Sequence, residues 1–285
     1  MPLKKCRLCE AGVADLLPSS LPSLKTMASS RPPAGSDGDV AALAARADCE
    51  NAAPLRVAVL NCEDAVKWAD HVDVLRCAYG SPGDAWTEYR CYDGEFPSDG
   101  DLDALDAVVC PGSRHSANDD ALPWVAGLLD ALRRAAARTD VRLLGICFGH
   151  QAVARALGGA VGANPGGGFR YAAEAVACRG WAGGALVLLE SHGECVTALP
   201  AGAACLGSSP GAAHEIVAVG ETVLTLQAHP EFTPALMNAR VWPAVAPRLA
   251  DADAARRAVA AADVDNAAAR RAIRAFLAGA APAGS

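Results

Sequence analysis

The stretch Arg142-Leu-Leu-Gly-Ile-Cys-Phe-Gly-His-Gln151 decides the fold of this chain. Its first half is an apolar strand, and its second half begins a helix predicted over residues 148–157. Cys147 lies at the junction, flanked by Gly145 and Gly149 in the pattern G-x-C-x-G. That pattern is typical of a nucleophile elbow, a strained strand-to-helix turn where only small residues fit two positions either side. The N-terminus of the following helix favours a thiolate, which is the reactive form of cysteine.

A buried structural cysteine between two tightly packed glycines would show the same short pattern. A second motif is therefore needed to distinguish a structural cysteine from a nucleophile. Such a motif occurs in Thr225-Leu-Gln-Ala-His-Pro-Glu-Phe232, where an apolar strand runs into His229. Pro230 restrains the backbone between this histidine and Glu231. A cysteine nucleophile needs a base within hydrogen-bond reach and a third group that orients the base. We therefore predict Cys147 as nucleophile, His229 as base and Glu231 as the orienting carboxylate.

Together, G-I-C-F-G-H-Q and Q-A-H-P-E resemble the class I glutamine amidotransferase family, whose catalytic triad is Cys, His and Glu. Within that family the chain closely resembles the stand-alone gamma-glutamyl peptidases of plants. The resemblance covers roughly residues 55–249. Further stretches that carry it are Asp93-Gly-Glu-Phe-Pro97, Cys110-Pro-Gly-Ser113 with Asn118-Asp119-Asp120, and Ser191-His-Gly-Glu194.

The resemblance implies roles for five further residues. Two backbone N–H groups, those of Phe148 and Gly112, would hold the oxyanion of acyl transfer. This chain has Cys-Pro-Gly where many family members have Gly-Gly-Pro. The residue that supplies the second N–H group is therefore fixed only to within one position. Gln151 would contact the glutamyl group of the substrate, and Ser191 and His192 would line its pocket. His192 is also the main rival to His229 as base, although no proline-held carboxylate accompanies it.

The predicted fold is a three-layer α/β, flavodoxin-like and mostly parallel sheet with a small antiparallel add-on. Continuous apolar runs at residues 55–60 and 106–110 are typical of strands buried in a parallel sheet. Such sheets place ligands at the carboxyl ends of their strands, where Cys147 lies. Runs of short strands without intervening helices suggest the antiparallel part. These short strands are predicted over residues 171–178, 185–189, 204–207 and 215–219, and a separate strand is predicted over residues 86–92.

Six segments besides the elbow helix are predicted to be helices or loops. Residues 122–138 are amphipathic, with leucines on one side and arginines on the other. The glycine-rich residues 158–168 are predicted to be a loop, since neither a P-loop nor a strand-GxGxxG-helix context accompanies them. Further helices are predicted over residues 65–79, 99–105, 233–249 and 254–277.

We expect three segments: residues 1–53 as a disordered or targeting extension, 54–250 as the catalytic domain, and 251–285 as an Ala- and Arg-rich C-terminal helix or tail. The first is rich in Pro, Ser, Ala and Gly and cannot bury enough apolar surface to offset its chain entropy. Its basic residues hint at a transit peptide, its acidic residues speak against one, and Met27 is an alternative start. Its single CxxC, Cys6-Arg-Leu-Cys9, lacks a second ligand pair at zinc-site spacing.

The amino-acid composition limits the binding partners and the cellular compartment that we expect for this protein. The net charge of −7 argues against a nucleic-acid surface. Eleven scattered cysteines indicate free thiols in a reducing compartment rather than a disulfide framework. No apolar run approaches the roughly 20 residues that span a bilayer. We expect a cytosolic protein with no nucleic-acid or membrane partner, and with no metal or other cofactor, while organelle targeting stays open.

The expected reaction is cysteine-dependent hydrolysis of γ-glutamyl amide bonds through a glutamyl thioester, on glutathione-type peptides. The segment after Glu231 is too short for a synthetase domain, which favours a stand-alone hydrolase. One alternative is a glutaminase subunit that supplies ammonia to a separate synthetase partner. A third alternative is a non-catalytic regulatory or redox-sensing thiol protein of the same fold.

Overall fold

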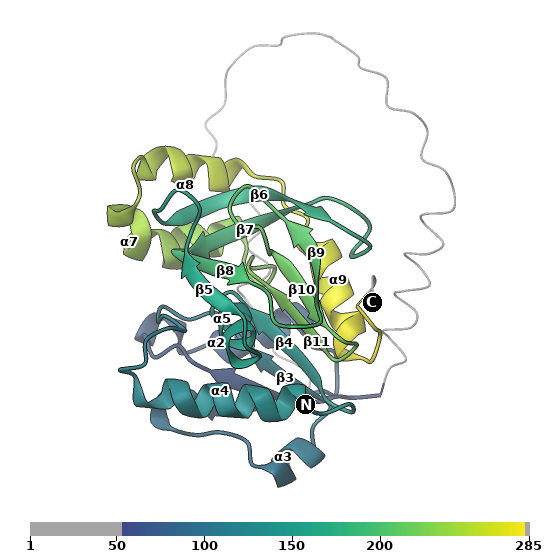
Figure 1. Ribbon diagram of the computed structural model, residues 1–285. Coiled ribbons are helices and arrows are strands. Elements are labelled where there is room, and N and C mark those ends of the chain that lie inside the picture. Colours follow the sequence, from purple (N-terminus) through teal and green to yellow (C-terminus); the bar gives the residue numbers. More distant parts are fainter. Residues whose placement is uncertain (1–52, 283–285) are drawn as a thin grey trace, which may run out of the picture.

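The computed structural model describes residues 53–282, so the predicted extension over residues 1–53 lies almost wholly outside the described residues (Figure 1). Within them one sheet of nine strands dominates, and its order is β2-β1-β3-β4-β11-β10-β9-β6-β7. The first five strands in that order are mutually parallel. They are β2 (Ala85–Arg90), β1 (Arg56–Asn61), β3 (Ala107–Cys110), β4 (Arg142–Ile146) and β11 (Val223–Leu226).

The other four strands continue the same sheet beyond β11 in antiparallel fashion. They are β10 (Ile216–Val219), β9 (Ala203–Ser208), β6 (Arg170–Cys178) and β7 (Leu186–His192). A separate two-stranded sheet pairs β5 (Ala160–Ala163) with β8 (Glu194–Ala198). The predicted α/β class is confirmed, and the antiparallel part extends the main sheet itself as well as forming a small second sheet.

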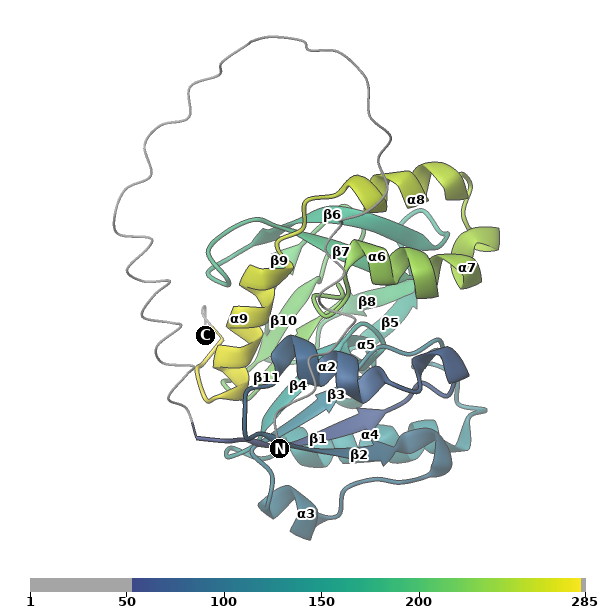
Figure 2. The ribbon, with the colours of Figure 1, turned by 180° about the vertical axis from the view of Figure 1, so that it is seen from behind.

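Helices cover both faces of the parallel strands, which makes three layers (Figures 1 and 2). The alternation within β1 shows this: Val57 and Val59 pack with α2 and α9, whereas Ala58 and Leu60 pack with α4 and α5. Successive side chains of a strand point to opposite faces, so an uninterrupted apolar run is what a strand between two helical layers requires. The helices are α2 (His71–Tyr79), α4 (Pro123–Ala136), α5 (Phe148–Ala156) and α9 (Asn266–Leu277), with the short α3 (Asp99–Asp103) beside α4.

Of the two long predicted helices, the first is confirmed as a continuous helical run and the second is divided. Residues 234–248 are helical without a break, but the hydrogen bonding changes to the π type over Met237–Val241 and to the 3₁₀ type over Ala246–Arg248, and Pro243 and Pro247 have no N–H to donate. Residues 254–277 are divided into two helices at Asp265, whose backbone N–H and carboxylate both bond to Val187 of β7. The pieces are α6 (Pro234–Leu236), η3 (Met237–Val241), α7 (Trp242–Val245) and η4 (Ala246–Arg248), followed by α8 (Ala252–Ala261) and α9.

The helix predicted over residues 65–79 begins instead as the 3₁₀ turn η1 (Val66–Trp68) before α2, and a second 3₁₀ turn, η2 (Cys91–Asp93), follows β2. The loop predicted over residues 158–168 is wrong in its first half, which contains β5. That strand exists because β8, thirty or so residues later, supplies its hydrogen-bond partners. The second half is a turn whose glycines, Gly166 to Gly168, all have positive φ. In the described range, no helix combines the length and the apolar character needed to cross a membrane.

Candidate active site

Cys147 occupies the turn between β4 and α5, and its backbone has φ 51° and ψ −102°, a region that residues with a side chain rarely adopt. A Cβ on Gly145 would lie 2.7 Å from the Gly149 carbonyl oxygen, and a Cβ on Gly149 only 1.9 Å from that of Cys110. Neither position can accept a side chain, as the elbow pattern predicted. The strained turn is therefore held by close backbone packing on both sides of the cysteine.

His229 and Glu231 follow the end of β11, the strand predicted before them, and the structure places β11 next to β4. Nδ1 of His229 lies 2.6 Å from Oε1 of Glu231, and the hydroxyl of Tyr79 donates to Oε2 of the same carboxylate at 3.1 Å. Burial alone would raise the pKa of Glu231, but the charge and hydrogen bond of His229 outweigh it and lower that pKa. Glu231 therefore remains a carboxylate that orients the imidazole.

The imidazole ring also packs face to face against an aromatic ring, a contact that the sequence analysis did not predict. Phe232 stacks on His229 with a centroid distance of 4.3 Å and an interplanar angle of 5°. Trp68 in turn stacks on Phe232, with a centroid distance of 5.2 Å. Phe232 directly follows the His-Pro-Glu motif, so its position next to His229 could have been predicted. Trp68 and Tyr79 come from η1 and α2, and no sequence pattern there indicated a role in the site.

The electrostatics of His229 suit an ion pair with the cysteine. Burial lowers the pKa of His229, but the charges of Cys147 and Glu231 and the hydrogen bonds to both side chains outweigh it, so the pKa is raised well above its usual value. An imidazolium beside the sulfur stabilises the thiolate form. By contrast, burial raises the pKa of Cys62 well above its usual value, which keeps that thiol protonated. The described cysteines are all free thiols, as expected.

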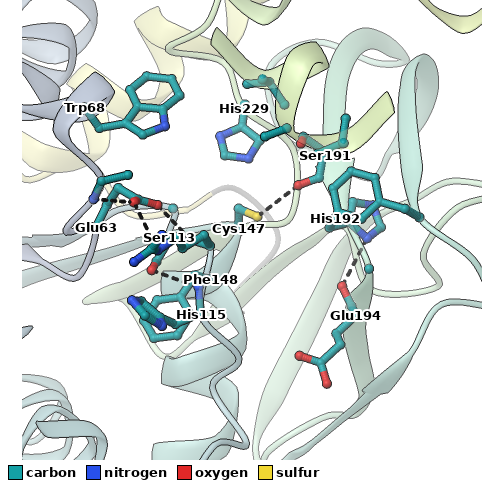
Figure 3. Close-up of a pocket in the computed structure, with 18 of the residues that line it drawn as sticks. Glu63, Trp68, Ser113, His115, Cys147, Phe148, Ser191, His192, Glu194 and His229 are labelled. Carbon is teal, nitrogen blue, oxygen red and sulfur yellow. Dashed lines mark hydrogen bonds and ion pairs between the residues drawn. The ribbon is translucent and has the colours of Figure 1, made fainter. Parts of the chain in front are cut away.

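The predicted oxyanion donors, the backbone N–H groups of Phe148 and Gly112, belong to residues that line the same cavity as Cys147; Figure 3 shows Phe148 near the sulfur. Phe148 is the first residue of α5, where backbone N–H groups have no partner within the helix. A Cβ on Gly112 would lie 2.8 Å from Cε1 of His229 and 3.7 Å from Cβ of Cys147. Both N–H groups thus belong to backbone next to the sulfur, and their role as donors stays a prediction.

The loop that carries Gly112 is tied down by Glu63, a buried residue that sequence reasoning also missed. Its carboxylate accepts from the N–H of Arg114 at 2.8 Å and from the N–H of Ala65 at 2.9 Å. The hydroxyl of Ser113 donates to the carbonyl of Cys62 at 2.7 Å. These bonds join the loops after β1 and β3, and so fix the backbone of Gly112 relative to Cys147.

Gly112→Ala is expected to lower kcat/KM by roughly 10²-fold, the size seen when one oxyanion donor is lost. The added methyl group collides with the imidazole of His229, so the loop must move away from the sulfur. Steady-state rates with a γ-glutamyl donor measure the loss. Gly202→Ala is the control for backbone strain, because Gly202 has φ 74° but open space around it. Equal activity losses in the two variants would contradict a specific role for Gly112.

The end of β7 and the start of β8 form one side of the site, here called the β7–β8 wall (residues 191–194). The thiol of Cys147 lies 3.7 Å from the carbonyl oxygen of Ser191. Nε2 of Gln151 donates to the carbonyl of Glu194 at 2.7 Å and to Oε1 of Gln227 at 3.2 Å. Gln151 therefore holds the β7–β8 wall in place, and its predicted contact with substrate stays a prediction.

His192 belongs to this wall, but its ring is engaged away from the sulfur (Figure 3). Its Nδ1 lies 2.8 Å from Oδ1 of Asn164 and 3.0 Å from the carbonyl oxygen of Glu194. The geometry therefore favours His229 over its rival as the base. His115, on the opposite side of the site, lies 3.1 Å from a carboxylate oxygen of Asp64.

The cysteine faces a cavity of about 660 Å³. The cavity continues from the wall past Phe169 and Arg248 to the short helical pieces η3, α7 and η4. Arg248 stacks over the ring of Phe169 at 4.3 Å and takes part in none of the ion pairs found between residues 53 and 282. A cation without a counter-ion in the cavity that the nucleophile faces is suited to a substrate carboxylate.

The chain thus combines an α/β sheet, a cysteine elbow, and a His–Glu pair at the end of the neighbouring parallel strand, an arrangement suited to nucleophilic catalysis by a thiol. Residues 93–243 match the family described as glutamine amidotransferase class-I, and the chain belongs to this family.

Curated relatives and solved structures agree with that family. The chain is 32% identical over 176 residues to gamma-glutamyl peptidase 3 of Arabidopsis thaliana, covering 58% of this chain and 70% of the relative. It is 33% identical over 145 residues to a putative glutamine amidotransferase of Saccharomyces cerevisiae, covering 48% and 58%. A glutamine amidotransferase structure from Thermotoga maritima has the same fold, with a TM-score of 0.61 at 18% identity over 79% of this chain and 99% of that one.

Proposed function

We propose that this protein hydrolyses γ-glutamyl amide bonds by a cysteine mechanism, on peptides of the glutathione type. The observation that carries the proposal is the arrangement of Cys147 beside the buried His229–Glu231 pair, with the sulfur facing an open cavity. All three groups have the residue types and the environment that acyl transfer through a thioester needs. The names of the Arabidopsis relatives support the γ-glutamyl specificity.

In the proposed first half-reaction, the thiolate of Cys147 attacks the γ-carbonyl carbon, and a tetrahedral oxyanion forms. The N–H groups of Phe148 and Gly112 stabilise that negative charge. His229, protonated and oriented by Glu231, gives its proton to the leaving nitrogen as the C–N bond breaks. The amine departs, and the γ-glutamyl group remains as a thioester on Cys147.

In the second half-reaction, water attacks the thioester carbon. His229, now neutral, takes a proton from that water, and the same two N–H groups hold the second oxyanion. Collapse of the intermediate breaks the C–S bond and releases glutamate. The proton on His229 then pairs again with the thiolate, which restores the starting state.

Two features of the cavity support a peptide as the leaving group. Its volume of about 660 Å³ lies within the range of roughly 300–1,000 Å³ typical of small-molecule sites, whereas ammonia needs almost no room to leave. Arg248 offers a charge to a carboxylate, and a γ-glutamyl peptide carries one on its glutamyl end and another on its C-terminus. The proposed substrate therefore matches the site in size and charge.

A second candidate is a glutaminase subunit that passes ammonia to a synthetase partner. The relatives named as putative glutamine amidotransferases favour it. It would use the same nucleophile and base, so the leaving group distinguishes the two functions. A regulatory or redox-sensing role without catalysis would instead leave the His229–Glu231 pair without a use.

We expect the purified protein to release glutamate from glutathione with a higher kcat/KM than from glutamine. Both substrates are compared under one condition, because specificity is a ratio of kcat/KM values. Intact-mass spectrometry after rapid acid quench should show the glutamyl adduct on Cys147. Glutamine preferred by tenfold, about 1.4 kcal/mol of transition-state binding, would contradict the peptidase proposal and favour the glutaminase.

A further inference from the structure

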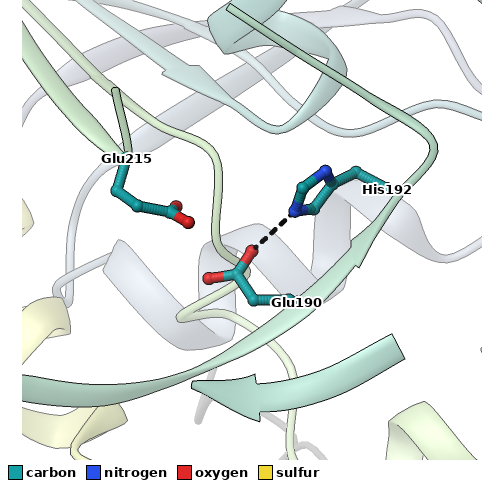
Figure 4. A group of neighbouring side chains, drawn as sticks. All are labelled: Glu190, His192 and Glu215. Carbon is teal, nitrogen blue, oxygen red and sulfur yellow. Dashed lines mark ion pairs between the residues drawn. The ribbon is translucent and has the colours of Figure 1, made fainter. Parts of the chain in front are cut away.

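Behind the β7–β8 wall, three polar side chains meet in the protein interior (Figure 4). Glu190 and His192 lie on β7, and Glu215 lies just before β10; their exposed fractions are 0%, 3% and 0%. Their nearest ligand-type atoms lie within 4.8 Å of one another, with Oε2 of Glu190 3.4 Å from Nε2 of His192. Within the described chain, both oxygens of Glu190, Nε2 of His192 and Oε2 of Glu215 have no hydrogen-bond partner. Buried carboxylates in this state need a compensating positive group.

The hydrogen bonds around His192 decide which of its nitrogens carries the proton. The amide nitrogen of Asn164 donates to the carbonyls of Gly168 at 3.1 Å and His192 at 2.8 Å, so its oxygen faces Nδ1 of His192. The carbonyl of Glu194 is a second acceptor at that nitrogen. Nδ1 therefore carries the hydrogen, and in the neutral ring Nε2 directs a lone pair at Glu190.

Burial lowers the pKa of His192, which favours the neutral ring. Three acceptors, the carboxyls of Glu190 and Glu215 and Nε2 of His192, then face one another. These three acceptors repel one another unless one of them carries a proton. A protonated carboxyl of Glu190 supplies the missing donor without any movement of the strand.

We propose that Glu190 holds a proton and donates it to Nε2 of His192, with Glu215 as the second carboxyl of this network, and that the network positions the β7–β8 wall against Cys147. The proposal rests on the proposed function, together with the predicted role of Ser191 and His192 in lining the glutamyl pocket. Glu190 and His192 point to one side of β7 while Ser191 points to the other, since side chains alternate along a strand. The network therefore acts through the strand, and its members are positioning residues.

Burial is the main reason that the pKa values of Glu190 and Glu215 are raised well above their usual values, a direction that favours a proton held in the network. A raised folded-state pKa stabilises the protonated network at low pH, and that stabilisation is lost as the pH rises through it. Substrate binding should accordingly weaken on the alkaline side. The ionisable groups that face the network are Arg170 and Glu174 on β6, His150 on α5, His214 before β10 and His229 after β11.

Two substitutions of Glu190 test the network in the full chain. Glu190→Gln keeps the shape and supplies a permanent N–H donor, so KM should stay near that of the wild type and lose its alkaline rise. Glu190→Ala leaves Nε2 of His192 without a partner, so KM should increase about tenfold with a much smaller change in kcat. Glu221→Gln, an exposed acid-to-amide change in the turn before β11, is the matched control and should change neither.

A readout independent of turnover separates this inference from the proposed function. Nitrogen-15 NMR of the histidines should assign His192 as the Nδ1–H tautomer, with His192→Asn identifying its signals. A wild type inactive on every γ-glutamyl donor would reject the proposed function, while the tautomer would still test the network. The network is overturned if His192 is found as the Nε2–H tautomer, or if the alkaline rise of KM is unchanged in Glu190→Gln. It is also overturned if the purified protein contains about one divalent metal ion per chain and Glu215→Gln removes that ion.

Discussion

Cys147→Ser is expected to lower kcat/KM for a γ-glutamyl donor by at least about 10⁴-fold, while the protein folds as the wild type does. Serine is nearly the same size as cysteine, so the packed elbow between Gly145 and Gly149 accepts it. A hydroxyl is much less acidic than a thiol, and the His229–Glu231 pair cannot hold it as an anion to the same extent. Glutamate release measures the activity, and thermal unfolding measures the fold.

Cys62→Ser is the matched control for this variant. Cys62 is also buried and lies near the site, after β1, but burial raises the pKa of its thiol well above the usual value. That variant should keep wild-type activity, and iodoacetamide should label Cys147 in the native protein. Turnover that survives in Cys147→Ser, or labelling at another cysteine that tracks inactivation, would remove the proposed nucleophile.

Glu231→Gln is expected to lower kcat/KM by about 10²- to 10⁴-fold, because an amide can present its N–H group to His229 and favour the wrong tautomer. The variant should also change the pH profile. The carboxylate of Glu231 helps to raise the pKa of His229, so its loss lowers that pKa. The alkaline limb of kcat/KM, where the imidazolium loses its proton, should move to lower pH.

Tyr79→Phe is the comparison for this effect, since it removes one donor to Glu231 and leaves the carboxylate in place. Its activity loss should be about tenfold or less, in line with about 1 kcal/mol for one hydrogen bond. The pH profiles of both variants and the wild type are recorded with the same substrate. An unshifted alkaline limb in Glu231→Gln would show that His229 is not the group that titrates there.

The sequence by itself determined those parts of the protein whose cause is local. The elbow at Cys147 could be predicted because Gly145 and Gly149 show the lack of space directly, and the structure confirms it at both positions. The apolar run of β1 predicted a strand covered on both faces, since the side chains that point to each face of that strand are apolar. The apolar run before His229 also predicted that this residue follows the end of a strand, whereas the structure shows that the strand lies next to that of the nucleophile.

Only the tertiary structure decided which distant groups complete the site. Tyr79 bonds to Glu231 across 152 residues of sequence, and Trp68 supports the His229 ring through Phe232. The strand β5 forms because β8 pairs with it, although the glycines before and after it favour a loop. Such partners are set by the packing of whole elements, which no local spacing encodes. For the same reason, a glutamate on β7 and another before β10 became neighbours only when the antiparallel strands assembled.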